Sequence, residues 1–574
     1  MPVIRRFSLL AGAALVAAAP LFAQTAKFDP QRLSQHVQTL GSDAFEGRAP
    51  ATPGETKTVA YLVDQFAKAG LQPGGDVVNG KRQWTQAVPL LRSEFTSVPH
   101  VAMNVAGTAK NLTQGEEIAV RAPTNGDRAI SIDGAELVFV GYGVKAPERG
   151  WDDFKGQDMR GKILVMLVND PDFEGGEGDF GGKAMTYYGR WTYKFEEGAR
   201  QGASGVLVIH ETEPASYGWA TVKNSNTNAM FDIVRANPRA EHPPLEGWIQ
   251  RDLAAQLFAA SGTSFEAMKA AAKRKDFKPL PLKANLTVHG TAKTEVIKSS
   301  NVVGLLPGKK RPDETVIYMG HWDHLGIGEP DSTGDRIFNG AIDNGTGIAQ
   351  LIEQARAFAR GPRPDRSVVF MAVTAEEKGL LGSEYYAANP LYPAGKTAGA
   401  INTDVLGVLG PARDFSVRGN QKLGLLDMLI EEGAKRGRRF TPDPSAATGT
   451  FYRSDHFTFA KAGIPALSFT PGRDLVTGGV EKAQAWETHY RTNMYHQPAD
   501  EFDPSWDFTG MVQDAELLHA LGLRLANSNA WPDWGLDSEF RAARDRTAGE
   551  RRIPPSAPAQ TDPAPEPAEP GERG

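Results

Sequence analysis

Apolar side chains recur at helical spacing in the N-terminal part of the chain. Between Leu33 and Gly70 they repeat every three or four residues, as at Val59, Leu62 and Phe66. This periodicity is typical of a helix with one face in a core, and Gly70 is a typical helix stop. The pattern therefore predicts a largely helical segment that packs against the rest of the fold.

From Asn301 onward, continuous apolar runs alternate with a helical stretch. Thr315–Gly320, Ser367–Val373 and Ala398–Thr403 have the pattern of buried strands, and Gly345–Phe358 has that of a helix. Strands that are apolar on both sides and alternate with helices favour a mainly parallel mixed sheet covered by helices on both faces. The predicted fold class is therefore α/β, and ligands are expected at the carboxyl ends of the strands.

A third pattern occupies residues 129–290. Short β-rich segments such as Ala135–Val140 are separated there by turns of Gly, Pro and Asp, and a helical pattern covers Trp191–Gly202. The change predicts a separate β-rich unit. It would be inserted into a discontinuous domain made of residues 24–128 and 291–545.

The two ends of the chain differ from the rest. Arg5 and Arg6 precede an apolar run, Phe7 to Phe22, that ends in Ala23, which is typical of a signal peptide. The run is shorter than the roughly 20 residues that span a bilayer. We therefore expect cleavage after Ala23, export to the periplasm or the medium, and no permanent membrane anchor. The arginine pair does not identify the export route. Residues 546–574 are rich in Pro, Ala, Glu and Ser and are predicted to be disordered.

Composition narrows the possible functions. Hydrophobic residues make up 40% and charged residues 23% of the 574 residues, which is ordinary for a soluble globular protein. The net charge of -6, with no long block of Lys or Arg, argues against a nucleic-acid partner. The sequence has no cysteine, which excludes disulfides, thiolate ligands and a thiol nucleophile. Any bound metal must therefore be held by His, Asp and Glu.

Polar residues directly follow the first predicted strand of the parallel sheet. Thr315–Gly320 runs into His321 and Asp323, a pair that can bind a metal but that alone is more often a hydrogen-bonded pair in a turn. Asp343 lies among glycines, where the backbone can crowd a ligand or the carboxylate can simply cap the next helix. Neither feature identifies a site without the others.

Two more strands bring carboxylates to the same edge of the sheet. Glu376 and Glu377 follow the second apolar run, and Asp404 follows the third. Adjacent glutamates are common on surfaces, but solvated pairs do not usually follow a buried strand at the edge where ligands bind. His496, which follows Tyr495, is the last candidate.

Together with Arg453-Ser454-Asp455-His456 and Gly463-Ile464-Pro465, these segments resemble the zinc-dependent aminopeptidases and glutamate-carboxypeptidase-like enzymes, a family of di-zinc exopeptidases. The resemblance covers Leu33 to about Asn527. The β-rich insert resembles a protease-associated domain. The resemblance implies a zinc exopeptidase fold and a peptide substrate.

Carried over residue by residue, the resemblance implies a site for two zinc ions. His321 and Asp404 would bind one ion, Glu377 and His496 would bind the other, and Asp343 would bridge both. Oxygen and nitrogen ligands of this kind suit catalytic zinc. The resemblance also implies a cis peptide bond after Asp343.

Three further residues receive catalytic roles. Glu376 would be the general base that takes a proton from water and passes it to the leaving amine. Asp323 would hydrogen-bond His321 and fix its tautomer. Tyr495 is the candidate oxyanion donor, because it precedes a ligand histidine as in the carboxypeptidase branch. The position at which the aminopeptidase branch often has a tyrosine holds Phe451 here, with Tyr452 beside it.

An aminopeptidase is the favoured function. A carboxypeptidase of the same family is the main alternative, and the choice depends on whether an acidic or a basic group faces the substrate terminus. A non-catalytic receptor-like relative and a single-zinc glutaminyl cyclase are disfavoured by the complete ligand set. No oligomeric state is predicted.

The remaining histidines and aromatic residues receive structural interpretations. The proposed ligand set is already complete, so three other histidines are expected to be hydrogen-bonded supporting groups: His324, His456 and His489. Aromatic residues in the insert are expected to pack in its core rather than line the substrate site: Tyr187, Tyr188, Trp191 and Tyr193.

Overall fold

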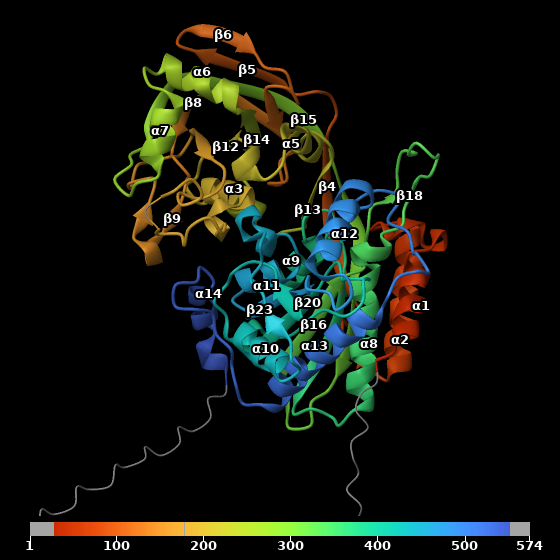
Figure 1. Cartoon of the computed structure of the whole chain (residues 1–574). Coiled ribbons are helices and arrows are strands. Elements are labelled where there is room, and N and C mark those ends of the chain that lie inside the picture. The colour runs from red at the N-terminus through yellow and green to blue at the C-terminus, as the bar shows by residue number, and fades with distance from the viewer. Residues whose placement is uncertain (1–27, 177, 552–574) are drawn as a thin grey trace, which may run out of the picture.

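The computed structural model describes residues 28–176 and 178–551 (Figure 1). The predicted signal peptide lies outside the described residues, as does the predicted tail beyond residue 551. Residues 546–551 are folded and include a 3-10 turn at Ala548–Glu550 that contacts another turn at Ala394–Lys396. The predicted start of the tail at residue 546 is therefore too early. None of the described helices combines the length and apolar character that a membrane crossing requires.

The larger sheet carries the predicted parallel strands. β19 (Arg366–Val373), β16 (Arg311–His321), β20 (Thr397–Thr403) and β23 (Ala466–Pro471) lie side by side in this order, each parallel to the next. β15 (Leu280–Leu306) pairs antiparallel with β19. The sheet is mixed but mainly parallel, which confirms the predicted fold class.

Further strands extend both edges of this sheet. β21 (Asp414–Val417) is antiparallel to β23 and parallel to β22 (Arg439–Phe440). On the other side, β4 (Thr85–Phe95) pairs with β15 and with β13 (Met230–Ile233). β13 belongs to the predicted insert by sequence, yet it adds a strand to the larger sheet.

Both faces of the larger sheet are buried. Successive side chains of a strand point to opposite sides, so neighbouring residues of one strand belong to different cores. On β16, Val316 and Tyr318 belong to one core, whereas Ile317 and Met319 belong to another. The first core is covered by the following helices: α1 (Pro30–Leu40), α2 (Pro53–Ala69), α8 (Gly347–Arg360), α10 (Gly424–Ala434) and α13 (Thr509–Asn527). The second is covered by α9 (Leu381–Ala388) and α11 (His456–Lys461).

A second unit with its own sheet and core lies above the first in Figure 1. Its strands are β5 (His100–Val105), β6 (Thr108–Asn111), β7 (Ile118–Val120), β8 (Ala129–Phe139), β11 (Ile163–Leu167), β12 (Gly205–His210), β14 (Leu245–Gln250) and the first part of β15. Its helices are α3 (Trp191–Arg200), α5 (Trp219–Asn226), α6 (Arg251–Ala260) and α7 (Phe265–Ala272). Because β5 to β7 belong to this sheet, the predicted boundary at residue 129 is too late, and the second unit begins near His100.

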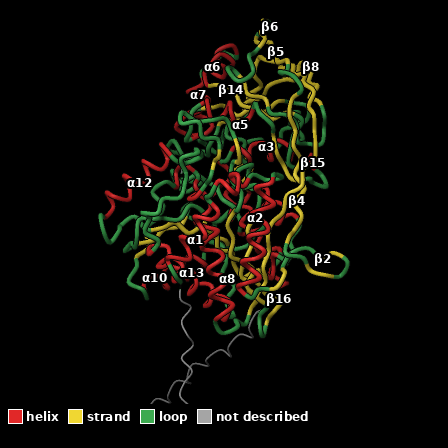
Figure 2. Tube along the Cα trace, turned by 90° about the vertical axis from the view of Figure 1, so that its right-hand side faces the viewer, coloured by secondary structure: helices red, strands yellow, loops and turns green. Residues whose placement is uncertain are grey.

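β15 is common to both sheets. Its residues 280–291 pair with β5 and β8 in the second unit, and its residues 292–306 pair with β4 and β19 in the larger sheet. Figure 2 shows β15 and β4 side by side as they leave the upper unit. The two units are therefore joined by continuous backbone pairing.

The aromatic residues of the insert are divided between core and interface. Tyr188 and Tyr193 are buried in the core of the second unit, as expected. Tyr187 instead lies between the units, where its ring centroid is 5.2 Å from that of Phe457. Trp191 is partly buried and packs against the smaller core on the other face of the second sheet.

The remaining strands and helices are β1 (Gln72–Pro73), β2 (Val77–Val78), β3 (Lys81–Arg82), β9 (Lys145–Ala146), β10 (Trp151–Asp152), β17 (Gly326–Ile327), β18 (Ile337–Phe338), α4 (Thr212–Ala215), α12 (Gly479–Asn493) and α14 (Arg541–Arg546).

Candidate metal centre

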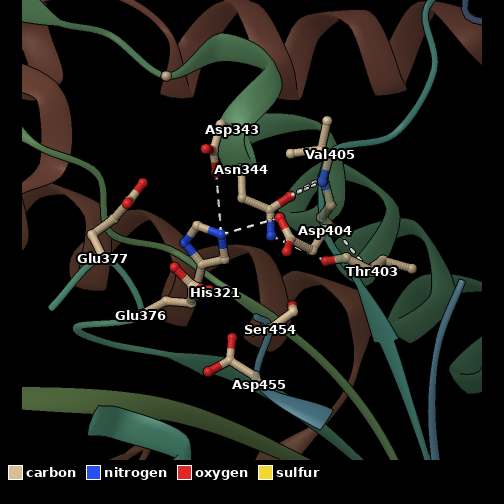
Figure 3. Close-up of polar contacts among 12 residues, drawn as sticks. His321, Asp343, Asn344, Glu376, Glu377, Thr403, Asp404, Val405, Ser454 and Asp455 are labelled. Atoms are coloured by element: carbon tan, nitrogen blue, oxygen red, sulfur yellow. Dashed lines mark hydrogen bonds and ion pairs between the residues drawn. The ribbon is translucent and has the colours of Figure 1, made fainter. Parts of the chain in front are cut away.

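The candidate ligands meet at the carboxyl edge of the larger sheet. His321 is the last residue of β16, Glu377 lies in the loop after β19, and Asp404 directly follows β20. Asp343 lies in the turn before α8, and His496 lies three residues after α12. Figure 3 shows four of these side chains at this edge: His321, Asp343, Glu377 and Asp404. The structure thus brings together segments that are up to 175 residues apart in the sequence.

One half of the centre surrounds His321. Its Nε2 atom is 3.3 Å from Asp343 Oδ1 and 3.3 Å from Asp404 Oδ1. The imidazole is buried, and so are both carboxylates. The resemblance assigns His321 and Asp404 as ligands of one zinc ion and Asp343 as the carboxylate that bridges the two ions.

The other half surrounds His496. Its Nε2 atom is 3.1 Å from Glu377 Oε2 and 3.4 Å from Asp343 Oδ2. The two oxygens of Asp343 therefore face different histidines, with Oδ1 toward His321 and Oδ2 toward His496. A carboxylate in this position can bind two cations at once.

Glu376 lies beside the first half of the centre. Potential ligand atoms of His321, Glu376 and Asp404 lie within 4.8 Å of one another. Burial raises the pKa of the Glu376 carboxyl well above its usual value, and the neighbouring charges of Glu377 and Asp404 act in the same direction. The residue is therefore close to the candidate ligands and has an environment that favours proton uptake.

The electrostatics of the centre favour a bound cation. Four carboxylates converge there (Asp343, Glu376, Glu377 and Asp404), and the one arginine among the described residues that forms an ion pair with them is Arg418, 3.3 Å from Asp404 Oδ2. Burial acts to lower the pKa of His496, but Asp343 and Glu377 outweigh it and raise that pKa to about 10. Buried carboxylates without enough positive charge are costly.

Asp323 supports the centre differently from the predicted way. His321 Nδ1 is 3.1 Å from the backbone carbonyl of Asp323 and 3.7 Å from its carboxylate. The carboxylate instead accepts hydrogen bonds from the backbone N–H groups of Glu376, at 3.1 Å, and Glu377, at 3.4 Å. Asp323 therefore orients His321 through its backbone and fixes the Glu376–Glu377 loop through its side chain.

Two residues that the sequence reading did not select hold the Asp343 turn. Asp500 accepts hydrogen bonds from the backbone N–H groups of Ile342, at 3.0 Å, and Asp343, at 3.1 Å. The buried guanidinium of Arg48 donates to backbone carbonyls on three segments, those of Trp322, Leu40 and Asn339 among them. Asp500 lies four residues after the candidate ligand His496, and this proximity in sequence could have identified it. No sequence pattern pointed to Arg48.

Asn344 connects the Asp343 turn to the end of β20. Its side-chain amide donates to the carbonyl of Thr403 at 3.0 Å, and its side-chain oxygen accepts from the backbone N–H of Val405 at 3.2 Å (Figure 3). The peptide bond between Asp343 and Asn344 is cis, as the resemblance implies. These contacts fix Asp343 relative to Asp404.

Tyr495 adjoins the candidate ligand His496 and is partly open to solvent. Its ring stacks on His496 with 3.9 Å between centroids, and the residue is 44% exposed. Partial burial and the carboxylates of the centre raise the pKa of its hydroxyl well above 10, so it remains a hydrogen-bond donor. By contrast, Tyr452 is buried and donates to Glu539 Oε1 at 2.8 Å, and Phe451 is buried in the core.

The three other histidines have different environments. His324 Nδ1 is 2.7 Å from Glu377 Oε1, so it contacts a candidate ligand. His489 hydrogen-bonds Asn493 within α12. His456 was expected to be hydrogen-bonded, but its two ring nitrogens have no partner among the described residues, and it packs edge-on against Phe451. Burial lowers the pKa of His456 to about 3, so it is a neutral core residue.

Buried carboxylates and imidazoles at the carboxyl edge of a mainly parallel sheet have the composition and the position of a candidate metal centre. Residues 301–519 match the model of Peptidase family M28, which confirms the resemblance drawn from the motifs. The matched segment contains every candidate ligand.

Individual relatives match parts of the chain. A "Probable zinc metalloprotease" of Pyricularia oryzae is 37% identical over 111 residues, which cover 19% of this chain and 22% of the relative. "Probable glutamate carboxypeptidase LAMP1" of Arabidopsis thaliana is 27% identical over 285 residues (44% and 36%), and "Probable lipoprotein aminopeptidase LpqL" of Mycobacterium tuberculosis is 29% identical over 262 residues (41% and 48%). The chain thus spans less than half the length of each of these relatives.

Among solved structures, an aminopeptidase from Aneurinibacillus sp. strain AM-1 aligns with 88% of this chain and 96% of its own, with a TM-score of 0.46 and 20% sequence identity.

Proposed function

We propose that this protein is an exported zinc-dependent exopeptidase, with aminopeptidase activity favoured, that binds two zinc ions. The observation that carries the proposal is the position of Asp343, whose two carboxylate oxygens face His321 and His496 at 3.3 and 3.4 Å. The M28 match over residues 301–519 supports the peptidase class. The N-terminal signal pattern supports export.

The residues present fit zinc. The candidate donors are imidazole nitrogens and carboxylate oxygens, which are normal ligands for catalytic zinc. Glu377 Oε1 is buried and receives no hydrogen bond of acceptable geometry from the described residues, although His324 Nδ1 is 2.7 Å away. His321 and Asp404 would hold one ion, Glu377 and His496 the other, and Asp343 both.

The proposed mechanism uses this chain's own groups for proton transfer and charge stabilisation. When bound, zinc would lower the pKa of a water and polarise the scissile carbonyl. Glu376, which is not assigned as a ligand, would accept the proton of the attacking water and deliver it to the leaving amine. Tyr495 would donate a hydrogen bond to the oxyanion that develops on the carbonyl oxygen. Asp323 would keep Glu376 in place through the backbone of its loop.

A substrate panel tests the proposal. Zinc-loaded mature protein should hydrolyse aminoacyl-anilides and peptides with a free N-terminus and should leave N-blocked peptides largely intact. Hydrolysis of N-blocked peptides from the carboxyl end would instead assign the chain to the carboxypeptidase alternative. The basic group that favours this alternative is Arg418, beside Asp404. Failure to cleave either set after zinc loading would contradict the peptidase proposal and favour a receptor-like relative.

Replacing Tyr495 with Phe should lower kcat by about 100-fold, because the loss of one oxyanion donor typically costs about 100- to 1,000-fold. KM should change little if the hydrogen bond forms only in the transition state. Steady-state kinetics measures both constants. Tyr385→Phe, on α9, is the matched control and should retain full activity. Equal activity of Tyr495→Phe and the wild-type protein would remove Tyr495 from the mechanism.

A further inference from the structure

A segment near the end of the larger unit lies against the second unit. Residues 531–540 belong to the stretch between α13 and α14, and we call them the C-terminal strap. Two aromatic side chains of the strap, Trp534 and Phe540, are buried in the core that covers one face of the larger sheet. The strap is therefore fixed to the larger unit on both sides of Glu539.

The carboxylate of Glu539 joins the two units. Its Oε1 atom accepts hydrogen bonds from the hydroxyl of Tyr452, in the larger unit, at 2.8 Å and from the backbone N–H of Tyr187, in the second unit, at 3.2 Å. Its Oε2 atom is 3.8 Å from Nη2 of Arg149, which also belongs to the second unit. The side chain of Glu539 is only 5% exposed, so these contacts are largely withdrawn from competing water. We call this arrangement the Glu539 junction.

Arg149 is held in place within the second unit and contacts the strap twice. Its Nη1 atom donates to the carbonyl of Asp179 at 2.7 Å, and the rings of Phe180 and Tyr188 lie 5.3 and 5.9 Å from its Cζ atom. Its Nη2 atom also donates to the backbone carbonyl of Asp537, in the strap, at 3.1 Å. The guanidinium therefore has a fixed position from which it meets the strap.

The Glu539 junction lies away from the strands that join the two units. Backbone pairing through β4 and β15 connects the units on the right in Figure 1, whereas α14, which follows the strap, lies on the left. A connection on one side alone would leave the second unit free to turn about it. Another contact between the units, Lys461 Nζ with Glu196 Oε1 at 2.9 Å, joins one pair of groups, whereas Glu539 joins three.

Tyr452 connects the Glu539 junction to the candidate metal centre. It directly precedes Arg453, whose Nη2 atom donates to the hydroxyl of Ser216 in the second unit. The next residue, Ser454, appears beside the candidate ligands in Figure 3, and its hydroxyl accepts a hydrogen bond at 2.7 Å from Asn402, in β20. The second unit therefore reaches the rim of the centre through the same segment that Glu539 holds.

We propose that Glu539 is a positioning residue that fixes the second unit against the larger unit and thereby sets the space in front of the candidate metal centre. The effect on substrates rests on the proposed peptidase function, whereas the effect on the arrangement of the units does not. A small substrate occupies only the region beside the metal ligands, but a longer peptide extends toward the second unit. Loss of Glu539 should therefore impair long peptides more than short substrates, because a surface that is not preorganised binds less tightly.

The arrangement of the units can be measured directly, because the chain has no cysteine. Ala270→Cys on α7 and Glu516→Cys on α13 change exposed residues, so spin labels at these positions would mark the second unit and the larger unit. Double electron–electron resonance on the full mature chain then gives the distribution of distances between the labels. We expect Glu539→Ala to shift and broaden this distribution. Glu539→Gln should have a smaller effect, since it keeps an oxygen at Oε1 but loses the charge that faces Arg149.

The effect on substrates is measured with the zinc-loaded forms without labels. kcat/KM would be determined for an aminoacyl-anilide and for a decapeptide with the same N-terminal residue. We expect the ratio of the decapeptide value to the anilide value to fall about 10-fold in Glu539→Ala, within the range of couplings between contacting residues. Asp537→Ala is the matched control, because Asp537 lies in the same strap but its carboxylate is 62% exposed and pairs with Lys422 of the larger unit. It should keep both the distances and the ratio.

The results separate this inference from the proposed function. If Glu539→Ala leaves the distance distribution unchanged, or if Asp537→Ala changes it equally, Glu539 does not fix the units. If the distribution changes but the ratio of kcat/KM values does not, the arrangement of the units does not affect substrates. If the distribution changes as expected but no form cleaves a peptide, the Glu539 junction is retained and the peptidase proposal fails. Should Glu539→Ala not fold, Glu539→Gln decides by the same criteria.

Discussion

Replacing Glu376 with Gln is expected to lower kcat by about 1,000-fold or more while the protein keeps its zinc. The amide has nearly the same shape as the carboxylate but cannot accept a proton, and general base catalysis typically contributes about 100- to 10,000-fold. The residue is half-buried beside His321 and Asp404, where withdrawal from water raises its pKa and favours proton uptake. Steady-state kinetics and metal analysis of the purified variant measure the two quantities.

Glu377→Gln is the matched control for this experiment. It changes the adjacent residue in the same way, but Glu377 lies 3.1 Å from His496 and is a candidate ligand. Glu377→Gln should therefore lose zinc as well as activity, because an amide is a weaker ligand than a carboxylate. Loss of zinc from Glu376→Gln would reassign Glu376 as a ligand, and unchanged turnover would exclude it as the base.

The second large effect is expected from Asp343→Asn. The wild-type protein should bind about two zinc ions per chain after reconstitution, since Asp343 faces both histidines and can serve both ions. Asn offers one ligand oxygen in place of two, so the variant should bind zinc at least about 100-fold more weakly, because even residues that only orient a ligand cost about 10- to 100-fold. Metal analysis after dialysis against a weak chelator, together with zinc titration, measures the change.

Asp331→Asn provides the control, because Asp331 is exposed and its carboxylate accepts hydrogen bonds within its own loop. It should bind zinc like the wild-type protein. The bridging assignment would be wrong if Asp343→Asn retained two tightly held ions. A wild-type protein that binds no zinc after reconstitution would remove the proposed metal centre altogether.

The strands and the residues at their ends were predictable because both follow from continuous apolar runs. His321, Glu376 and Asp404 each stand within a few residues of such a run, and the structure places them at one edge. His496 follows a helix, so its return to Glu377 depends on how the chain packs. Without the resemblance, no local pattern identified it.

The boundary of the second unit was missed in part because β6, the second of its strands, lacks an apolar pattern, although β5 before it alternates. All four residues of β6 are exposed, so the strand shows no apolar alternation that would identify it. Arg48 was missed for a related reason, since its role depends on carbonyls that are distant in sequence.

The strand shared by both sheets constrains how this protein can be rebuilt. Side chains alternate between two faces along β15, so adding one residue near Ala292 would turn the outward positions of one sheet inward unless the chain formed a bulge. Exchanging the upper unit for that of a homologue would therefore require a graft that leaves the length of this strand unchanged or changes it by an even number of residues. With that phase kept, a graft would preserve the contact between Tyr187 and Phe457; with it lost, the two halves of the molecule would no longer face each other correctly.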